Sequence, residues 1–174
     1  VYRLIPYLFR PKKSTEQDLG VSLLVCHKDV VMALYSLQTL FYQLKRNLPV
    51  YMVDDGSLTT ADYKILRQLF SVTIVSKQKA LFNIRRNFGR YSWVIRYLSD
   101  NSNHVKRFKL AILLLSPFEK NIFIEPDILF FNPPKAIKLF FTDNRDCYST
   151  LHKKIYEWFV RDNIVELHYR RLFY

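Results

Sequence analysis

The chain has 174 residues, of which 49% are hydrophobic, and its formal net charge is +12. This length and apolar content fit one folded domain and exclude an intrinsically disordered chain. The longest purely apolar run, Leu110–Leu115, is far shorter than the roughly 18 residues of a membrane-spanning helix, so no transmembrane anchor is expected. Two cysteines, Cys26 and Cys147, exclude a dense disulfide framework and favour a reducing compartment.

The first regular elements are expected after a lead-in segment. Residues 1–20 contain scattered prolines and a glycine without any hydrophobic period, which is typical of irregular structure. Val21–Cys26 is a short apolar run that predicts a buried strand, with Cys26 inside it. From Asp29, apolar residues recur with helical spacing, which predicts a helix through Val30, Leu34, Leu37, Phe41, Leu44 and Leu48.

A second strand, helix and third strand follow directly. Pro49–Val53 predicts a strand, and Asp54–Ser57 has the glycine and short polar side chains of a turn. Thr59 and Asp62 have the spacing of a capping box at the start of a helix. A third strand is predicted from Val72 to Val75.

The rest of the chain alternates in the same way, with weaker signals near the end. Ala80–Tyr97 predicts one or two amphipathic helices broken at Gly89, followed by a loop at Ser99–Asn103. Val105–Ser116 predicts a helix that stops before a proline, and Asn121 opens another strand. Later expectations are a short helix, a strand and a long helix, at Lys135–Phe141, Cys147–Leu151 and Lys153–Leu172.

Strands that alternate with helices predict an α/β fold: a Rossmann-like, mostly parallel sheet with helices on both faces. In such sheets ligands bind outside the carboxyl ends of the strands, where Asp54, Asp55, Glu125 and Asp127 would all lie. Glu125 and Asp127 are one residue apart at the end of a buried strand and are expected to project to the same side. Two such oxygen ligands suit Mg²⁺ or Mn²⁺.

The excess positive charge is concentrated in one part of the sequence. Between Lys64 and Lys109 there are eleven basic residues and one acid, Asp100. A surface patch of this kind attracts phosphates of a nucleotide, a nucleic acid or an anionic lipid surface. The alternative is a solvated face that only keeps the protein soluble. Regularly interleaved aromatic residues are lacking, which counts against binding of single-stranded nucleic acid.

Taken in order, four features resemble the nucleotide-sugar-dependent glycosyltransferases of the type A fold. Together they cover about residues 21 to 142. They are the strand Val21–Cys26 with its helix containing Ser36-Leu37, the turn Val53–Ser57, the apolar helix opened by Lys109-Leu110, and Ile124–Phe130 in the place of the DxD motif.

The resemblance implies a nucleotide site at the first two strands. Val25 would lie against the base, and Asp54 or Asp55 would hydrogen-bond uracil or ribose. Lys109 matches a basic position that contacts the nucleotide or its diphosphate. His27, at the end of the first strand, is also within reach of a nucleotide, with a structural histidine as the alternative.

The resemblance also implies a metal site. Asp127 matches the more invariant acid of the family motif, and Glu125 replaces the usual first Asp. The alternative for these two acids is that they cap a helix or pair with Lys120 and Lys135. The alternative for Asp54-Asp55 is a structural turn, and that for Lys109 is a solvated position on a helix. No catalytic base is assigned.

The expected function is therefore metal-dependent transfer of a sugar from a nucleoside diphosphate, UDP in particular, to an acceptor glycan, lipid or protein. The setting implied is polysaccharide biosynthesis in the cytoplasm, with peripheral contact at the inner face of an anionic membrane. Residues 21–151 would form the nucleotide-sugar domain, and 152–174 a helical segment continuing into a longer protein. The rivals are a sugar-phosphate nucleotidyltransferase, a basic nucleic-acid or membrane-surface binding protein, and an inactive glycosyltransferase remnant.

Overall fold

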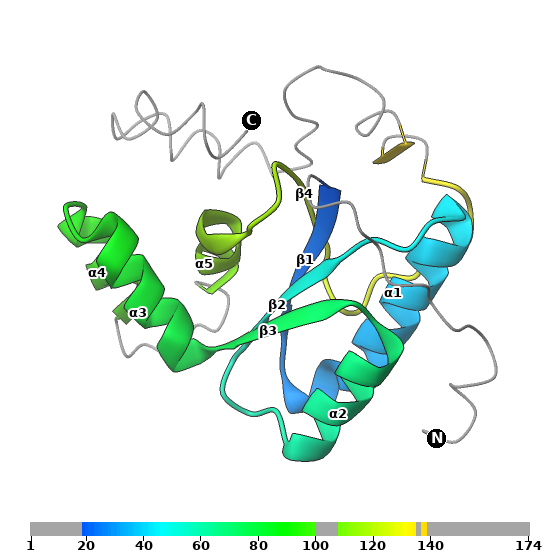
Figure 1. Ribbon diagram of the computed structural model, residues 1–174, viewed down its shortest axis with the longest axis horizontal. Helices are drawn as coiled ribbons and strands as arrows, with labels where there is room; N and C mark the ends of the chain where they lie inside the picture. The colour runs from blue at the N-terminus through cyan, green and yellow to red at the C-terminus, as the bar shows by residue number, and fades with distance from the viewer. Residues whose placement is uncertain (1–18, 100–107, 135–136, 139–174) are drawn as a thin grey trace. The chain divides into compact units, whose positions relative to one another are not determined.

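The computed structural model of the chain describes residues 19–99, 108–134 and 137–138, and it divides into two units, Val1–Pro133 and Pro134–Tyr174. All the elements considered below belong to the first unit (Figure 1). Its strands are β1 (Leu19–Val25), β2 (Val50–Asp54), β3 (Val72–Ser76) and β4 (Lys120–Phe123). Its helices are η2 (His27–Asp29), α1 (Val30–Leu44), α2 (Thr60–Leu69), α3 (Lys77–Phe88), α4 (Ser92–Ser99) and α5 (Phe108–Leu115).

The four strands form one parallel sheet in the order β3-β2-β1-β4. Val25 pairs with Asp54, which in turn pairs with Ser76, so β1, β2 and β3 end level with one another. The chain moves outward from β1 to β3 and then returns to add β4 on the other side of β1. Because the winding reverses between β1 and β4, the carboxyl ends of these two strands form the switch point where ligands bind in open α/β sheets. The predicted Rossmann-like α/β fold is confirmed.

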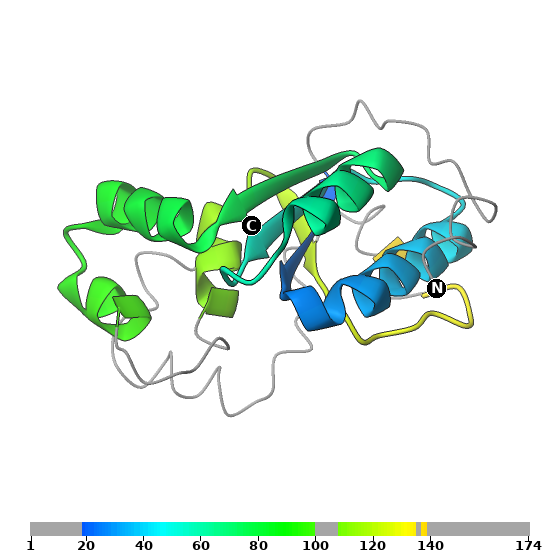
Figure 2. The same ribbon diagram turned by 90° about the horizontal axis from the view of Figure 1, so that it is seen from below.

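Helices cover both faces of the sheet because alternate strand residues point to opposite sides. On one face, Leu24, Tyr51 and Val53 belong to a buried cluster with residues of α3, α4 and α5. On the other, α1 and α2 cover the sheet (Figures 1 and 2). The apolar side chains buried on α1 recur at helical spacing and are Val30, Ala33, Leu34, Leu37, Leu40 and Phe41.

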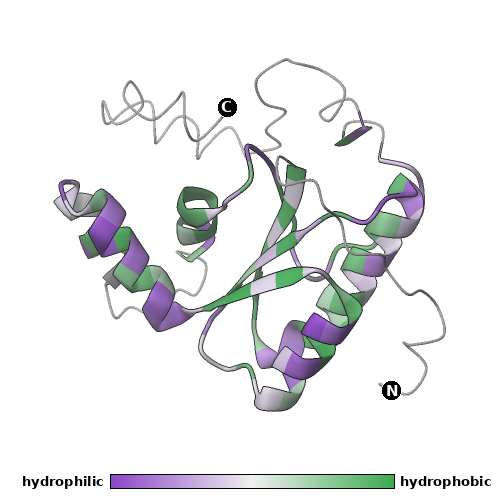
Figure 3. Cartoon of the chain, viewed as in Figure 1, coloured by the Kyte–Doolittle hydropathy of each residue, from purple (hydrophilic) through white to green (hydrophobic). Residues whose placement is uncertain are grey.

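The helices differ in how their hydrophobic and polar residues are distributed. Helix α5 and the central strands are almost wholly hydrophobic, whereas α2 and α3 carry a polar side toward solvent (Figure 3). The ring of Phe41 on α1 packs edge-on against Phe70 at the end of α2, with centroids 6.0 Å apart. Among the described helices, none is both long enough and apolar enough to cross a bilayer.

Most predicted elements have the expected position, and the differences have physical causes. Strand β1 begins at Leu19, so the lead-in segment ends earlier than expected. Cys26 lies just after the strand, half-buried, with its thiol donating to Asp29 Oδ2 at 3.1 Å. The break at Gly89 does separate two helices, α3 and α4. The expectations that fall wholly or largely outside the described residues are the loop after residue 99, the start of the helix at 105 and everything predicted from 135 onward.

Gly20 is inside β1 because another part of the chain needs its space. A Cβ built on Gly20 would overlap the aromatic ring of Phe118, in the segment that leads into β4. We expect Gly20→Ala to lower the free energy of unfolding by about 1–3 kcal/mol, since the ring must be displaced. Urea unfolding followed by circular dichroism measures this.

The double variant Gly20→Ala/Phe118→Ala serves as the control for that prediction. Removing the ring removes the overlap. Gly20→Ala should therefore lower the free energy of unfolding much less in a Phe118→Ala background than in the native protein. If Gly20→Ala costs the same in both backgrounds, the close approach of Phe118 is not the reason for the glycine.

Candidate functional site

Polar side chains from all four strands gather at the carboxyl edge of the sheet. His27 lies just beyond β1, and the turn Asp54–Ser57 begins at the last residue of β2. Lys77 follows β3, and Glu125 lies two residues beyond β4. Because parallel strands end at the same edge, residues separated by up to about a hundred positions in sequence come together there.

Asp54 stabilises the turn after β2, and both of its carboxylate oxygens accept hydrogen bonds there. It is buried, and its Oδ1 accepts hydrogen bonds from the backbone N–H of Gly56 at 2.7 Å and of Leu58 at 3.2 Å. Its Oδ2 accepts the hydroxyl of Tyr63 at 2.8 Å. Burial and this carboxylate raise the pKa of Tyr63 to about 12, so the phenol stays protonated as a donor. Gly56 has φ of 101°, a conformation that favours glycine.

Asp55 is less occupied than Asp54 and therefore better placed to bind a ligand. Its N–H donates to the carbonyl of Val25 at 3.2 Å, and its Oδ1 accepts the N–H and hydroxyl of Ser57 at 2.9 and 2.6 Å. Its Oδ2 accepts no hydrogen bond from a described residue. The Val25 side chain is fully buried, so at this edge only its backbone is available, and that supports Asp55.

His27 is fixed to the start of α2 by a buried carboxylate. Its N–H donates to Ser57 Oγ at 2.8 Å, and its Nδ1 lies 2.7 Å from Asp62 Oδ2. That oxygen also accepts the N–H and hydroxyl of Thr59, at 2.8 and 2.7 Å, and Thr59 Oγ1 accepts the N–H of Asp62, so the predicted capping box is confirmed. The imidazole is half-exposed and keeps Nε2 for another partner.

The pKa of Asp62 makes this part of the site sensitive to acid. Burial acts to raise it, but hydrogen bonds from Thr59 and His27 outweigh burial, so the pKa lies below the usual 3.8. A depressed carboxyl pKa contributes stability above its unfolded value and loses it as pH falls through the folded value. We expect Asp62→Ala to lower the free energy of unfolding by about 1–2 kcal/mol at pH 7, and the difference from native to shrink below about pH 4.

Urea titrations at pH 7 and pH 3 measure both parts of that expectation. Glu119→Gln is a matched control, because Glu119 is exposed and makes no ion pair with a described residue. It should change stability by less than about 0.5 kcal/mol. A difference between Asp62→Ala and native protein that stays constant from pH 7 to pH 3 would exclude the proposed electrostatic role.

Lys109 and Glu125 form an ion pair on the β4 side of the edge. Lys109 is the second residue of α5, and its ammonium contacts Glu125 Oε1 and lies 5.9 Å from the centroid of the Phe123 ring. The two side chains are 33% and 41% exposed. An ion pair so open to water is worth little in stability, so a ligand can displace it at low cost. The two positions that the resemblance assigns to diphosphate and metal are thus in direct contact.

Glu125 and Asp127 were expected to project together from the end of a strand, but this prediction is wrong. Strand β4 already ends at Phe123, and the chain then turns. The N–H of Ile128 donates to the carbonyl of Glu125 at 3.4 Å, which closes a turn around Pro126 and Asp127. Asp127 is exposed and makes no hydrogen bond or ion pair with a described residue.

The segment from Glu125 to Phe131 is anchored along α1 by three hydrogen bonds. They are Ser36 Oγ to the Glu125 carbonyl at 3.5 Å, the Phe130 N–H to Thr39 Oγ1 at 3.2 Å, and Gln43 Nε2 to the Phe131 carbonyl at 3.0 Å. The backbone that carries both acids is therefore held between α1 and β4.

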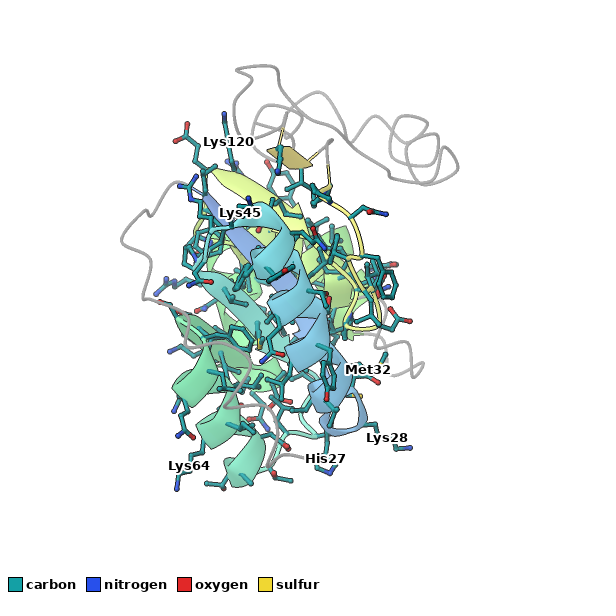
Figure 4. All side chains as sticks on the ribbon, turned by 90° about the vertical axis from the view of Figure 1, so that its right-hand side faces the viewer. His27, Lys28, Met32, Lys45, Lys64 and Lys120 are labelled. Atoms are coloured by element: carbon teal, nitrogen blue, oxygen red, sulfur yellow. The ribbon has the colours of Figure 1, made fainter. Side chains whose placement is uncertain are left out.

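The alternative partner considered for these acids, Lys120, lies elsewhere. It opens β4, and Figure 4 shows it at the opposite end of the molecule from His27, whereas Glu125 follows the end of that strand. Lys135 is outside the described residues. The partner of Glu125 is instead Lys109, from a different element.

Glu125 and Asp127 suit a hard divalent cation in their chemistry but provide only part of a coordination shell. Among the described residues, no group of three or more His, Cys, Asp or Glu side chains could hold a metal. Mg²⁺ and Mn²⁺ sites that bind nucleotides commonly use one or two carboxylates and complete their shell with substrate phosphates and water. The donor set fits a cation that binds together with a phosphate ligand.

The basic region found in the sequence does not form a single surface. Lys64 and Arg67 lie on α2, which covers one face of the sheet, whereas the basic residues of α3 and α4 cover the other. Arg67 lies over the ring of Tyr63, with its guanidinium 5.4 Å from the ring centroid. The charge is therefore divided between two faces.

Comparison with models of known protein families and with curated proteins gives no match.

The predicted residues form two groups, and no hydrogen bond or ion pair between described residues joins one group to the other. One contains Val25, His27, Asp54 and Asp55, and the other contains Lys109 and Glu125, with Asp127 beside it in sequence. The sequence placed Ser57 in a turn and Asp62 in a capping box without linking either to the site, and it gave Tyr63 and Lys77 no role there. A usable signal existed for Lys77, because it lies two residues beyond the strand predicted at Val72–Val75 and therefore near the same edge.

Proposed function

We propose that this chain is the donor-binding part of a metal-dependent glycosyltransferase that uses a nucleoside-diphosphate sugar, with UDP as the nucleotide. The observation that carries the proposal is the position of Glu125 and Asp127 directly after β4, which pairs with β1 at the switch point of a parallel sheet. Lys109 in contact with Glu125 adds a cation at the same place.

The residues would divide the work according to their environment. Asp55, with one unoccupied carboxylate oxygen, would accept hydrogen bonds from the ribose or uracil, and Asp54 would keep the turn in shape. His27, half-exposed and fixed by Asp62, would donate or accept through Nε2 at the nucleoside side. Val25, whose side chain is buried, would act indirectly, through its carbonyl that accepts the N–H of Asp55.

Glu125 and Asp127 would hold Mg²⁺ or Mn²⁺, and the bound cation would supply electrostatic stabilisation of the diphosphate that leaves. Lys109 would add its positive charge to the same phosphates, since departure of the nucleoside diphosphate concentrates negative charge there. This charge stabilisation is what the described residues contribute to sugar transfer. The acceptor would be a glycan, a lipid or a protein.

The proposed setting is polysaccharide biosynthesis in the cytoplasm, with the acceptor at the inner face of a membrane. The net charge of +12 favours contact with anionic lipid headgroups. Because the basic residues are divided between two faces of the sheet, nucleic-acid binding through one continuous patch is disfavoured.

Saturation-transfer NMR with a set of UDP-, GDP- and ADP-sugars in Mg²⁺ tests the proposal. The uridine and sugar protons of UDP donors should receive saturation from the protein, and a chelator should remove the effect. If no donor receives saturation from protein that circular dichroism shows to be folded, nucleotide-sugar binding is refuted. An inactive remnant would bind the donor but would transfer no sugar to any acceptor.

A further inference from the structure

Lys77 occupies a position at the carboxyl edge that the proposed function has not yet used. It is the first residue after β3, and its side chain is exposed. A Cβ built on Gly56 would lie 4.0 Å from Lys77 Cδ, so the side chain runs beside the turn that contains Asp55. Its ammonium lies 5.1 Å from the ring centroid of Phe108. Lys77 therefore reaches from the end of β3, past the β2 turn, to the start of α5.

Phe108 and Lys109 are consecutive, so the first turn of α5 connects two lysines from different parts of the chain. Lys77 lies over the ring of Phe108, and Lys109 lies over the ring of Phe123. Phe108 is buried, which fixes the surface on which the Lys77 ammonium lies.

The two lysines differ in how their charge is compensated. Lys109 contacts Glu125, whereas Lys77 forms no ion pair with any described residue and has only the aromatic ring beneath its ammonium. An aromatic face holds an exposed ammonium weakly, while a phosphate oxygen forms a much stronger, charge-assisted hydrogen bond with it. Lys77 is thus a cation that an incoming anion can recruit without breaking an existing salt bridge.

We propose that Lys77 is a second phosphate-binding lysine of the donor site and that, together with Lys109, it makes the site selective for diphosphates over monophosphates. The inference rests on the proposed function. Two ammonium groups carried by different elements suit a ligand with two phosphoryl groups, because each phosphoryl group can take one of them, whereas a monophosphate offers a single group. Lysine suits this role as a compact, adaptable point charge.

Calorimetric titration of UDP and UMP in Mn²⁺, and of inorganic pyrophosphate, tests the inference on native protein, Lys77→Met and Lys79→Met. Methionine keeps the apolar part of the side chain beside Gly56 and Phe108. Lys79, exposed on the same helix, is the matched control, since its described hydrogen bond uses only its backbone N–H. For Lys77→Met we expect the affinity for UDP to fall about tenfold and the affinity for UMP by less than about threefold.

A second variant, Lys77→Arg, guards against loss of the fold. It keeps the charge and the contact with the Phe108 ring, so UDP affinity should stay within about threefold of native. Lys79→Met should leave both affinities unchanged.

Each remaining outcome would overturn the inference in a recognisable way. Native binding of UDP that Lys77→Met leaves unchanged would remove Lys77 from the site while leaving the proposed function intact. Equal losses in Lys77→Met and Lys79→Met would reduce the effect to general surface charge. Native protein that binds neither UDP nor pyrophosphate would refute both the inference and the proposed donor site.

Discussion

Asp127→Asn is expected to lower the affinity for UDP in the presence of Mn²⁺ on the order of 100-fold, and to leave metal-free binding almost unchanged. The substitution keeps the size and one carbonyl oxygen of the side chain but removes its charge. Asp127 is exposed and makes no ion pair with a described residue, so its charge is available to a cation and is not needed for the fold. Isothermal titration of UDP, with Mn²⁺ and with chelator, measures the effect.

Two controls separate this effect from general loss of charge or of structure. Glu119→Gln removes a negative charge from an exposed residue before β4 and should bind UDP as the native protein does. The thermal unfolding temperature of Asp127→Asn should equal that of native protein, because the side chain is not packed. Native-like, metal-dependent binding by Asp127→Asn would remove this residue from the metal site.

Lys109→Met is expected to change two affinities in opposite directions. UDP affinity should fall about 10- to 100-fold, because a charge-assisted hydrogen bond to phosphate is lost. Mn²⁺ affinity in the absence of nucleotide should rise, because an ammonium in contact with Glu125 repels a cation and occupies an oxygen that the metal needs. Methionine retains an apolar side chain beside the Phe123 ring, so the fold should be unaffected.

The opposite signs make this prediction specific to the ion pair. Mn²⁺ binding can be followed by the electron paramagnetic resonance signal of the free ion, and UDP binding by calorimetry, each on Lys109→Met and on Lys79→Met. Only the first variant should change either affinity. A fall in metal affinity, or unchanged UDP affinity, in Lys109→Met would show that Lys109 does not alternate between Glu125 and phosphate.

The order of strands and helices could be predicted because each of its signals is local. Apolar runs such as Val21–Cys26 and Val72–Val75 are recognisable within a few residues, and so is the capping box of Thr59 and Asp62. Parallel topology then places the acids after β2 and β4 at one edge. The start of β1 could not be predicted, because Gly20 resembles a loop residue until Phe118, almost a hundred positions later, is known to need its space.

The contacts of the site could not be predicted, because they join distant segments. The sequence offers Lys120 as the nearest lysine to Glu125, whereas the fold brings Lys109 to it by way of α5. Asp54 and Asp55 are equivalent in sequence, yet three hydrogen bonds to Asp54 and the less occupied carboxylate of Asp55 distinguish them in space. The basic region is continuous in sequence but lies on both faces of the sheet, because α2 and α3 cover opposite sides.

The most direct measurement of the central claim is a calorimetric titration of UDP into the purified chain, once with Mn²⁺ and once with excess chelator. We expect saturable, one-to-one binding that is much weaker in chelator than in Mn²⁺, and that Asp127→Asn weakens in Mn²⁺ on the order of 100-fold. Binding of equal strength with and without metal would contradict a donor site built on Glu125 and Asp127. No binding in either condition, by a chain that circular dichroism shows to be folded, would refute the nucleotide site itself.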